Sequence, residues 1–255
     1  MSERITNYNA GMQQLEGKTA LVTGGAKRIG RELALSLAQA GAQIAITYRD
    51  SKSDAEHTVR QIAQLGGRAH AVHCDLNDEV SVRAAARSAI AQLGGLDLLV
   101  NNAGAYETRN VEEITADEFD LMFGTNVRAP FLLSQACIPE LRRRKGRLIN
   151  IGSLGGLRPW ATHAHYCSSK AALHMLTQAM AKALAPEMSV NCVAPGMIVF
   201  PSSEETDETA HFAKKTPMRR NGTAADVAAA VLFFATCPKF ITGQILAVDG
   251  GLSLV

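Results

Sequence analysis

The stretch ALVTGGAKRIGRELALSLAQAGAQIAITYRD, residues 20–50, decides the fold class of this chain. An apolar run from Thr19 to Val22 predicts a buried strand at its start. Apolar residues at helical spacing over Glu32 to Ala40 predict a helix, which Gly41 ends. A second apolar strand follows over Ile44 to Thr47. Strand, helix and strand in this order form a βαβ unit.

Glycines lie between the first strand and the helix, over Gly24 to Gly30. A glycine-rich turn at a helix N-terminus is where the pyrophosphate of a dinucleotide binds. Gly24 permits a tight turn, and Gly30 permits close approach of helix and strand. An ordinary glycine turn without a ligand is the alternative, and the order of the elements favours the nucleotide site.

Five further apolar runs of strand length follow along the chain. They are Ala69–His73, Leu96–Val100, Arg147–Ile151, Ser189–Val193 and Ile245–Val248. Helical patterns fill the intervals, and two helices, around 117–143 and 163–184, are long. This alternation predicts an α/β fold, a Rossmann-type doubly wound parallel sheet of about seven strands with helices on both faces.

The chain contains no linker with a shift in composition. We therefore expect one domain over residues 17–255, preceded by an N-terminal extension over residues 1–16. The segment Phe200–Lys215 breaks the rhythm of strands and helices, because it is rich in acidic residues and ends in two lysines. It predicts a polar insertion, as a loop or short helix pair, that lies over the substrate.

The composition of the 255 residues excludes several classes of protein. A formal net charge of +2 suggests no nucleic-acid or membrane partner. The five cysteines are scattered without C-x-x-C spacing, which argues against a disulfide framework or a zinc site and fits the reducing cytoplasm. The first residues show no apolar core of a signal peptide, and no run approaches the roughly 18 apolar residues of a membrane span.

Tyr166 and Lys170 stand four residues apart in HAHYCSSKAALHML, residues 163–176, and Ser153 lies thirteen residues before Tyr166. Positions i and i+4 share one face of a helix. A nearby ammonium favours the phenolate and lowers the pKa of a tyrosine, whose ordinary value is about 10. The pair can then exchange a proton with a carbonyl or alcohol oxygen. The alternative is that Tyr166 and Lys170 form only an exposed pair on the surface of a helix.

Together these motifs resemble the classical short-chain dehydrogenase/reductase family. The resemblance rests on TGGAKRIG at 23–30, NNAG at 101–104, Asn126, Ser153, Tyr166-x-x-x-Lys170 and Pro195–Gly196, from about Gly17 to the C-terminus. The closing ITGQILAVDGG resembles ketoacyl-reductase-like members. Arg28, however, replaces the middle glycine of the family's TGxxxGxG turn. That variant resembles pteridine reductases, which usually carry Asp where this chain has Ser153.

The resemblance implies a catalytic set of Asn126, Ser153, Tyr166 and Lys170. Ser153 would hydrogen-bond the substrate oxygen, Tyr166 would supply its proton, and Lys170 would lower the pKa of Tyr166 and hold the nicotinamide ribose. Asn126 would fix a water that relays protons to Lys170. His163, His165 and His174 flank this region, and we interpret them as surface or pocket-lining residues, with no metal site expected.

The cofactor expected is NADP(H). NAD-binding members place an acid at the end of the second strand, where this chain has Tyr48 and Arg49. Arg49, Lys27 and Arg28 offer positive charge to a 2′-phosphate. Asp50 could neutralise the charge of Arg49. The alternative to a phosphate-binding role is that Arg49 and Lys27 are solvated surface charges.

The expected cofactor contacts extend over several segments. They are Gly24, Lys27, Arg28, Ile29, Gly30, Tyr48, Arg49, Asp75, Leu76, Asn102, Ala103, Gly104, Tyr166, Lys170, Pro195, Gly196 and Ile198. By resemblance Asp75 and Leu76 would hold the adenine, although CDLND also suits a helix N-cap. Phe200 stands where the family often has Thr.

Three functions remain open at this point. The first is an NADPH-dependent reductase of a small-molecule carbonyl substrate, a ketone or 3-oxoacyl compound, and the second is a pteridine or dihydropterin reductase. The third is a non-catalytic NADP-binding sensor or scaffold, which would not require Ser153, Tyr166 and Lys170. The resemblance also implies a homotetramer. Apolar positions on the outer faces of the long helices would need a partner: Phe131, Leu132, Ala171, Ala172 and Met175.

Overall fold

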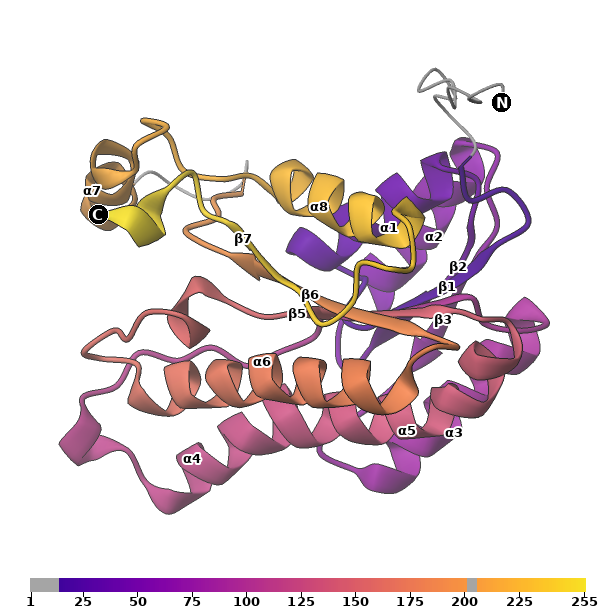
Figure 1. The fold of residues 1–255 in the computed structure, drawn as a ribbon, viewed down its shortest axis with the longest axis horizontal. Coiled ribbons are helices and arrows are strands. Elements are labelled where there is room, and N and C mark those ends of the chain that lie inside the picture. The colour runs from indigo at the N-terminus through magenta and orange to yellow at the C-terminus, as the bar shows by residue number, and fades with distance from the viewer. Residues whose placement is uncertain (1–13, 201–205) are drawn as a thin grey trace, which may run out of the picture.

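The structure, a computed structural model, describes residues 14–200 and 206–255. One sheet of seven parallel strands runs through it in the order β3-β2-β1-β4-β5-β6-β7 (Figure 1). The strands are β1 Thr19–Val22, β2 Gln43–Tyr48, β3 Ala69–His73, β4 Leu98–Asn101, β5 Arg147–Ile151, β6 Ser189–Pro195 and β7 Ile245–Val248. The predicted fold class and all seven predicted strands are confirmed, with ends that differ by at most two residues.

Helices cover both faces of the sheet, in two layers (Figure 1). One layer contains α1 Arg28–Gln39, α2 Lys52–Gln64 and α8 Ala224–Thr236, and the other contains α3 Glu79–Leu93, α5 Ala129–Arg143 and α6 Ala164–Leu184. Shorter elements are η1 Val111–Glu113, α4 Ala116–Phe123, η2 Gly124–Arg128, η3 Leu154–Gly156, α7 Asp207–Lys215 and η4 Leu252–Leu254.

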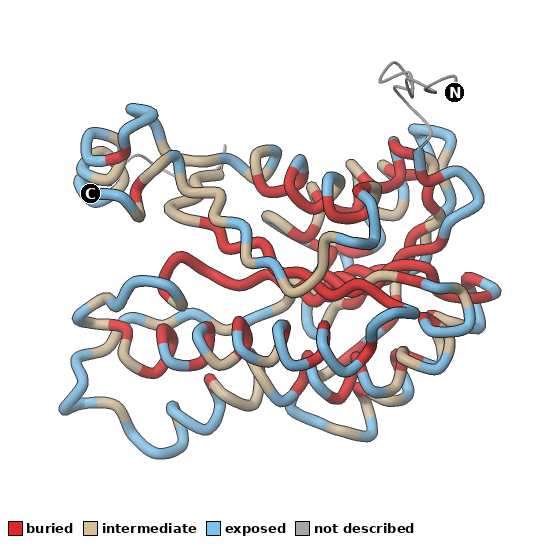
Figure 2. Tube along the Cα trace, in the orientation of Figure 1, coloured by how far each residue is buried: buried red, intermediate tan, exposed pale blue. Residues whose placement is uncertain are grey.

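The core consists of two apolar layers, one on each face of the sheet. Successive side chains of a strand point to opposite faces. In β1, Ala20 and Val22 therefore pack against one helix layer, whereas Leu21 packs against the other. Figure 2 shows the buried residues concentrated along the strands and on the inner sides of the helices. Burial on both faces explains why the central strands β1, β2 and β4 read as continuous apolar runs, whereas the edge strands β3 and β7 are only partly buried.

Three predicted boundaries change in the structure. Helix α1 begins at Arg28, four residues before the predicted Glu32, because the glycine turn itself leads into the helix. The predicted helix over 117–143 is divided into α4 and α5 by the π-helical turn Gly124–Arg128. Only one helix, α7, is described in the polar segment 200–215, and residues 201–205 of that segment lie outside the described residues.

The described part of the expected N-terminal extension packs on the fold. Leu15 is buried, and its N–H donates to the Ala40 carbonyl at 2.8 Å. Residues 1–13 lie outside the described residues. None of the helices in the described ranges is long and apolar enough to cross a membrane.

Candidate active site

The carboxyl ends of the parallel strands meet along one edge of the sheet, and this edge collects the residues singled out in the sequence. Ligands of open parallel sheets bind at this edge. The glycine turn follows β1, Tyr48 ends β2, Asn102–Gly104 follows β4, Ser153 follows β5 and Pro195 ends β6. Segments far apart in the chain therefore form one continuous rim.

The glycine turn is tight and leaves no room for side chains at its key positions. Gly24 has a φ of +62°, in the left-handed region that favours glycine, and its N–H donates to Thr47 Oγ1 at 3.1 Å. A methyl group at Gly30 would overlap the Gly24 carbonyl and the Asn102 side chain. The predicted tight turn and close approach are confirmed. Lys27, the N-cap residue of α1, makes no side-chain capping hydrogen bond.

The segment after β4 is tied to the end of β1. The Thr23 hydroxyl accepts hydrogen bonds from the N–H groups of Asn102 at 2.8 Å and Ala103 at 2.9 Å. The Asn102 amide donates to the Thr23 carbonyl at 2.8 Å. Asn102 thus holds the glycine turn in place in this structure, and its contact with a cofactor stays a prediction.

Lys170 lies in the interior beside Tyr166, one turn away on α6. Its Nζ donates to the Ile151 carbonyl at 3.0 Å and lies 5.9 Å from the centre of the Tyr166 ring. Burial lowers the pKa of Lys170 to about 8. The exposed helix pair that the sequence left open is excluded, because both side chains are buried.

The pKa of Tyr166 is shifted in the direction opposite to the sequence prediction. Burial raises it to about 12, and a hydrogen bond with the Ser153 side chain opposes that rise. The Lys170 ammonium is bonded to a carbonyl instead of to the phenol, so desolvation outweighs the expected effect of its charge. Tyr166 is therefore a protonated phenol at neutral pH, which suits a proton donor.

Ser153 lies between the end of β5 and the beginning of the short helix η3. Its hydroxyl accepts a hydrogen bond from the Gly155 N–H at 3.0 Å. Gly155 is packed so closely that a methyl group on it would lie 3.2 Å from Cys167 Sγ, 3.3 Å from Tyr166 Cε1 and 3.4 Å from Ser153 Oγ. The serine and the tyrosine thus occupy one small volume, as the sequence predicted.

Asn126 lies in the π-helical turn, a deviation that often marks functional sites. Its amide donates to the Ala105 carbonyl at 3.0 Å and to Ser169 Oγ at 2.9 Å, and its oxygen accepts the Ala105 N–H at 2.8 Å. These bonds secure the chain just after Gly104. The expected role of Asn126 in ordering a water for Lys170 stays a prediction.

Aromatic side chains that the sequence analysis missed surround Tyr166. The Tyr106 ring stands edge-on to Tyr166 at 4.9 Å between ring centres, and Trp160 stacks on Tyr166 at 6.1 Å. The His163 ring contacts both Tyr106 and Trp160, and its Nε2 is 2.8 Å from the Tyr106 hydroxyl. Tyr106 follows the NNAG motif by two residues, which is the one sequence signal that could have indicated it.

The three histidines are less exposed than we predicted. His163, His165 and His174 are all buried, so the surface interpretation is wrong, although His165 does line a pocket of about 420 Å³. Burial lowers the pKa of His163, and it lowers that of His174 to about 4, so both are neutral at pH 7. Among the described residues, no group of His, Cys, Asp and Glu side chains could hold a metal ion.

Two of the three cations expected at a 2′-phosphate, Lys27 and Arg49, already have carboxylate partners. Lys27 pairs with Asp54 at 3.0 Å, and Arg49 pairs with Asp50 at 2.6 Å. A hydrogen bond to Asp50 and its charge raise the pKa of Arg49. The neutralisation of Arg49 by Asp50, which the sequence left open, is thus present in the structure.

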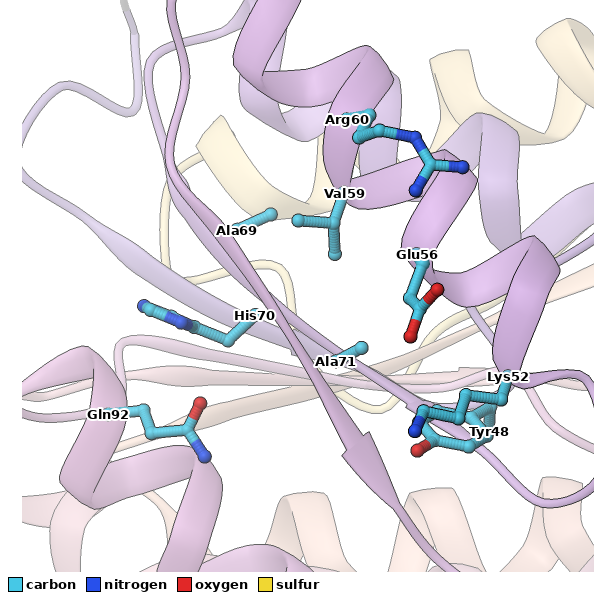
Figure 3. Close-up of a pocket in the computed structure, with 9 residues that line it drawn as sticks. All are labelled: Tyr48, Lys52, Glu56, Val59, Arg60, Ala69, His70, Ala71 and Gln92. Atoms are coloured by element: carbon cyan, nitrogen blue, oxygen red, sulfur yellow. The ribbon is translucent and has the colours of Figure 1, made fainter.

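Tyr48, the last residue of β2, contacts the neighbouring strand β3. It contacts the His73 ring edge-on at 5.7 Å and helps to line a pocket of about 410 Å³ between α2 and β3. Figure 3 shows its ring beside Lys52, at the beginning of α2, with Arg60 and His70 further along the pocket.

The helix N-cap that CDLND suggested falls on Asp78, not on Asp75. Asp78 accepts the N–H groups of Val80 at 2.9 Å and Ser81 at 3.2 Å at the beginning of α3. The Asp75 carboxylate accepts the Asn77 N–H at 3.0 Å instead. The adenine contacts of Asp75 and Leu76 stay a prediction.

The segment after β6 completes the rim. The Gly196 N–H donates to the Val248 carbonyl at 3.0 Å, and a methyl group at Gly196 would lie 2.8 Å from Asp249 Cβ. Ile198 forms an isolated parallel bridge with Gly222, which fixes the path of the chain before Phe200. The Arg28 guanidinium lies 5.7 Å from the centre of the Phe200 ring.

Comparisons with known proteins agree with this architecture. A family model described as enoyl-(acyl carrier protein) reductase matches residues 24–253. The chain is 37% identical over 243 residues to a 3-oxoacyl-(acyl-carrier-protein) reductase of Staphylococcus aureus, covering 92% of this chain and 98% of that protein.

Solved structures are also similar in both fold and sequence, and two of them serve as examples. A short-chain dehydrogenase/reductase from Serratia marcescens has a TM-score of 0.90 and 34% identity, covering 94% of this chain and 100% of that one. A blue fluorescent protein from a metagenomic library, solved in complex with NADPH, has a TM-score of 0.89 and 37% identity, covering 94% of this chain and 99% of that one.

Proposed function

The chain belongs to the short-chain dehydrogenase/reductase family of oxidoreductases, and from this premise we propose that it uses NADPH to reduce the carbonyl group of a ketone or 3-oxoacyl compound to an alcohol. The observation that carries the proposal is the buried cluster of Ser153, Tyr166 and Lys170 at the carboxyl edge of the sheet. A binding protein without chemistry has no need of a buried phenol beside a buried ammonium, since burying both groups costs free energy.

The glycine turn fits a dinucleotide. Side chains are excluded at Gly24 and Gly30, so the backbone N–H groups at the beginning of α1 can approach a diphosphate closely. Asn102–Gly104, Pro195–Gly196 and Ile198 would line the remainder of the crevice. NADPH supplies the hydride when bound. The neighbour solved with NADPH supports this cofactor.

The residues of this chain supply orientation and the proton. We infer that the Ser153 hydroxyl donates a hydrogen bond to the carbonyl oxygen of the substrate. Tyr166, protonated because burial raises its pKa, gives its proton to the same oxygen. Lys170 then stabilises the phenolate by its charge, and Asn126 keeps the segment after Gly104 in place.

The fall in kcat/KM on the alkaline side of the pH profile tests the role proposed for the Lys170 ammonium. Because burial places its pKa near 8, we expect kcat/KM for NADPH, which reports the free enzyme, to fall above about pH 8 as the ammonium loses its proton. In Lys170→Arg the guanidinium stays charged, so this fall should disappear even if the rate is lower. An unchanged fall in Lys170→Arg would assign it to another group.

Cofactor choice can be tested at the end of β2. Arg49→Asp places a carboxylate where a 2′-phosphate would lie, so we expect KM for NADPH to rise about tenfold more than KM for NADH, the loss of one charge-assisted hydrogen bond. Asp50→Asn is the matched control, because it frees Arg49 and should lower KM for NADPH. Equal effects of Arg49→Asp on both cofactors would show that Arg49 does not contact the phosphate.

Dihydropterins are a second candidate class of substrate. Flat aromatic surfaces at Tyr106 and Trp160 beside Tyr166 would suit a flat ring, and Arg28 stands in the pteridine-reductase-like turn. The deciding experiment measures NADPH oxidation with ketones, acetoacetyl thioesters, quinones and dihydropterins. Turnover of ketones or thioesters supports the first proposal, and turnover of dihydropterins alone supports the second. NADPH binding without turnover of any class would favour a sensor.

We also propose that the protein assembles as a homotetramer in the reducing cytoplasm. All five cysteines are free and buried. Phe131 on α5 and Met175 on α6 are exposed by 43% and 64%, as expected for faces that meet a second copy. Leu132 was wrongly included among the outer positions, because it is buried against the sheet-facing core.

Light scattering at micromolar concentration should show the mass of four chains. The double variant Phe131→Glu/Met175→Glu should reduce that mass, because charges would replace the apolar contacts, with the fold confirmed by circular dichroism. A monomeric wild-type protein would refute the assembly.

A further inference from the structure

A cavity of about 590 Å³ lies at the edge of the sheet opposite to the candidate active site. It is formed by the amino ends of β1, β4 and β5 and by the segment that follows α8. Strand β5 begins in this cavity at Arg147 and ends at Ile151, two residues before Ser153. Its five residues extend over about 13 Å at about 3.3 Å per residue, so the cavity is separate from the catalytic cluster. Its volume is within the range of about 300–1,000 Å³ that is usual for small-molecule sites.

Basic side chains dominate the walls of this cavity. Of the residues that line it, one is acidic, Asp97, and five are basic: Lys18, Arg144, Lys145, Arg147 and Lys239. Asp97 already pairs with Lys18 at 3.1 Å and with Arg144 at 3.1 Å. Over residues 14–200 and 206–255, no carboxylate lies within salt-bridge distance of Lys145, Arg147 or Lys239. Three positive charges therefore have no carboxylate partner in that part of the chain.

Backbone carbonyl groups fix two of these cations. The Arg147 guanidinium donates to the Cys237 carbonyl at 2.6 Å and to the Phe234 carbonyl at 3.2 Å, at the end of α8. The Lys239 ammonium donates to the Lys145 carbonyl, which brings the two lysines to the same wall. A guanidinium has five N–H donors and an ammonium has three, so both groups keep donors for a ligand.

The positive charges converge on one volume. The pKa of Lys239 is lowered, and burial is the largest cause. The positive charges of Arg147, Lys145 and Lys18 lower this pKa further. Helices α5 and α8 both end at the cavity, and each C-terminal end carries about half a negative elementary charge. The two dipoles thus compensate about one of the three positive charges, and an anion would compensate the others.

Lys145 adopts a backbone conformation that favours glycine. Its φ is +52°, in the left-handed region, directly after the C-cap residue Arg144 of α5. Helices commonly have a glycine at this position, because a side chain there costs free energy. Residues strained in this way are concentrated at ligand and active sites.

We propose that this cavity binds a small molecule carrying a phosphate or diphosphate group, with the anionic group held by Lys145, Arg147 and Lys239. Phosphate suits these donors, because it accepts charge-assisted hydrogen bonds from guanidinium and ammonium groups and carries close to two negative charges. The Phe233 ring, 48% exposed, and Leu15 line the same cavity and suit the organic part of such a molecule. This binding is independent of the proposed reduction, because the residues that line the cavity are not those assigned to the reaction.

Isothermal titration calorimetry with inorganic pyrophosphate tests the proposal, at about 150 mM salt to screen non-specific attraction. We expect the double variant Lys145→Gly/Lys239→Gln to weaken binding at this cavity about 10-fold or more, because two charge-assisted hydrogen bonds are lost. The first change relieves the backbone strain, and the second keeps a donor for the carbonyl group of residue 145. The melting temperature of the free protein should therefore not fall.

Two control variants separate this cavity from other places that attract the anion. Gly30→Ala changes the glycine turn proposed to bind the cofactor diphosphate, and it should leave binding at the cavity unchanged. Lys182→Gln removes one positive charge from an exposed residue of α6 outside the cavity lining, and it should also have no effect.

The proposal is wrong if the wild-type protein does not bind pyrophosphate, or if the double variant binds it as tightly as the wild-type protein does. Loss of all binding in Gly30→Ala would place the anion at the glycine turn and would overturn the proposal. An equal loss of affinity in Lys182→Gln and in the double variant would overturn it too, because net charge alone would then attract the anion.

Discussion

Replacing Tyr166 by Phe should lower kcat by about 10²–10⁴-fold, the usual contribution of a general acid. The change removes only the hydroxyl group and keeps the ring that packs against Tyr106 and Trp160. The dissociation constant for NADPH should therefore change little. Steady-state rates with the best substrate of the screen, together with fluorescence titration of NADPH, measure the two effects separately.

Tyr106→Phe is the matched control for this experiment. It also removes one phenolic hydroxyl, but that hydroxyl is bonded to His163 at 2.8 Å and belongs to the wall around the site. We expect its kcat to fall far less than that of Tyr166→Phe. If Tyr166→Phe turns over substrate at the wild-type rate, Tyr166 is not the proton donor. If kcat falls equally in Tyr166→Phe and Tyr106→Phe, the loss comes from the aromatic surroundings of the site and not from the hydroxyl of Tyr166 in particular.

Gly30→Ala should raise the dissociation constant for NADPH about 10–100-fold. The added methyl group would overlap the Gly24 carbonyl and the Asn102 side chain, so the turn and the end of β4 must move apart. Overpacking of this kind costs about 1–3 kcal/mol, and here it distorts the surface that would receive the diphosphate. Fluorescence titration measures the affinity, and thermal unfolding measures the loss of stability.

Gly124→Ala is the corresponding control, because a methyl group there meets nothing nearer than Asn77 Oδ1 at 3.8 Å. Its affinity for NADPH should equal that of the wild-type protein. If Gly30→Ala also binds NADPH like the wild-type protein, the cofactor does not use this turn, and the site would have to be sought elsewhere on the rim.

The two pKa shifts support the proposal that Tyr166 would supply the proton in a reduction at this site. Burial raises the pKa of Tyr166 to about 12 and lowers that of Lys170 to about 8, so each group is pushed toward its neutral form. A protonated phenol is the form that donates. The negative charge of the phenolate formed by this donation would raise the pKa of Lys170 again and so favour its ammonium form, since opposite charges close together stabilise each other.

The sequence by itself determined the order of the elements and the type of fold. Apolar runs of strand length, helical periodicity and the glycines at 24 and 30 are local patterns, so the sequence shows them without any knowledge of the packing. The spacing of Tyr166 and Lys170 likewise placed both residues on one turn of α6, because i and i+4 share a face of any helix.

Only the tertiary structure decided the electrostatics and the walls of the site. The pKa of Tyr166 depends on how much water the surrounding elements exclude, and Lys170 is bonded to Ile151 from another strand. The Arg28 guanidinium lies 5.7 Å from the centre of the Phe200 ring, which is 172 positions further along the chain. Contacts between residues so far apart leave no periodic trace in the sequence, because they arise from the packing of whole elements and not from the conformation of neighbouring residues.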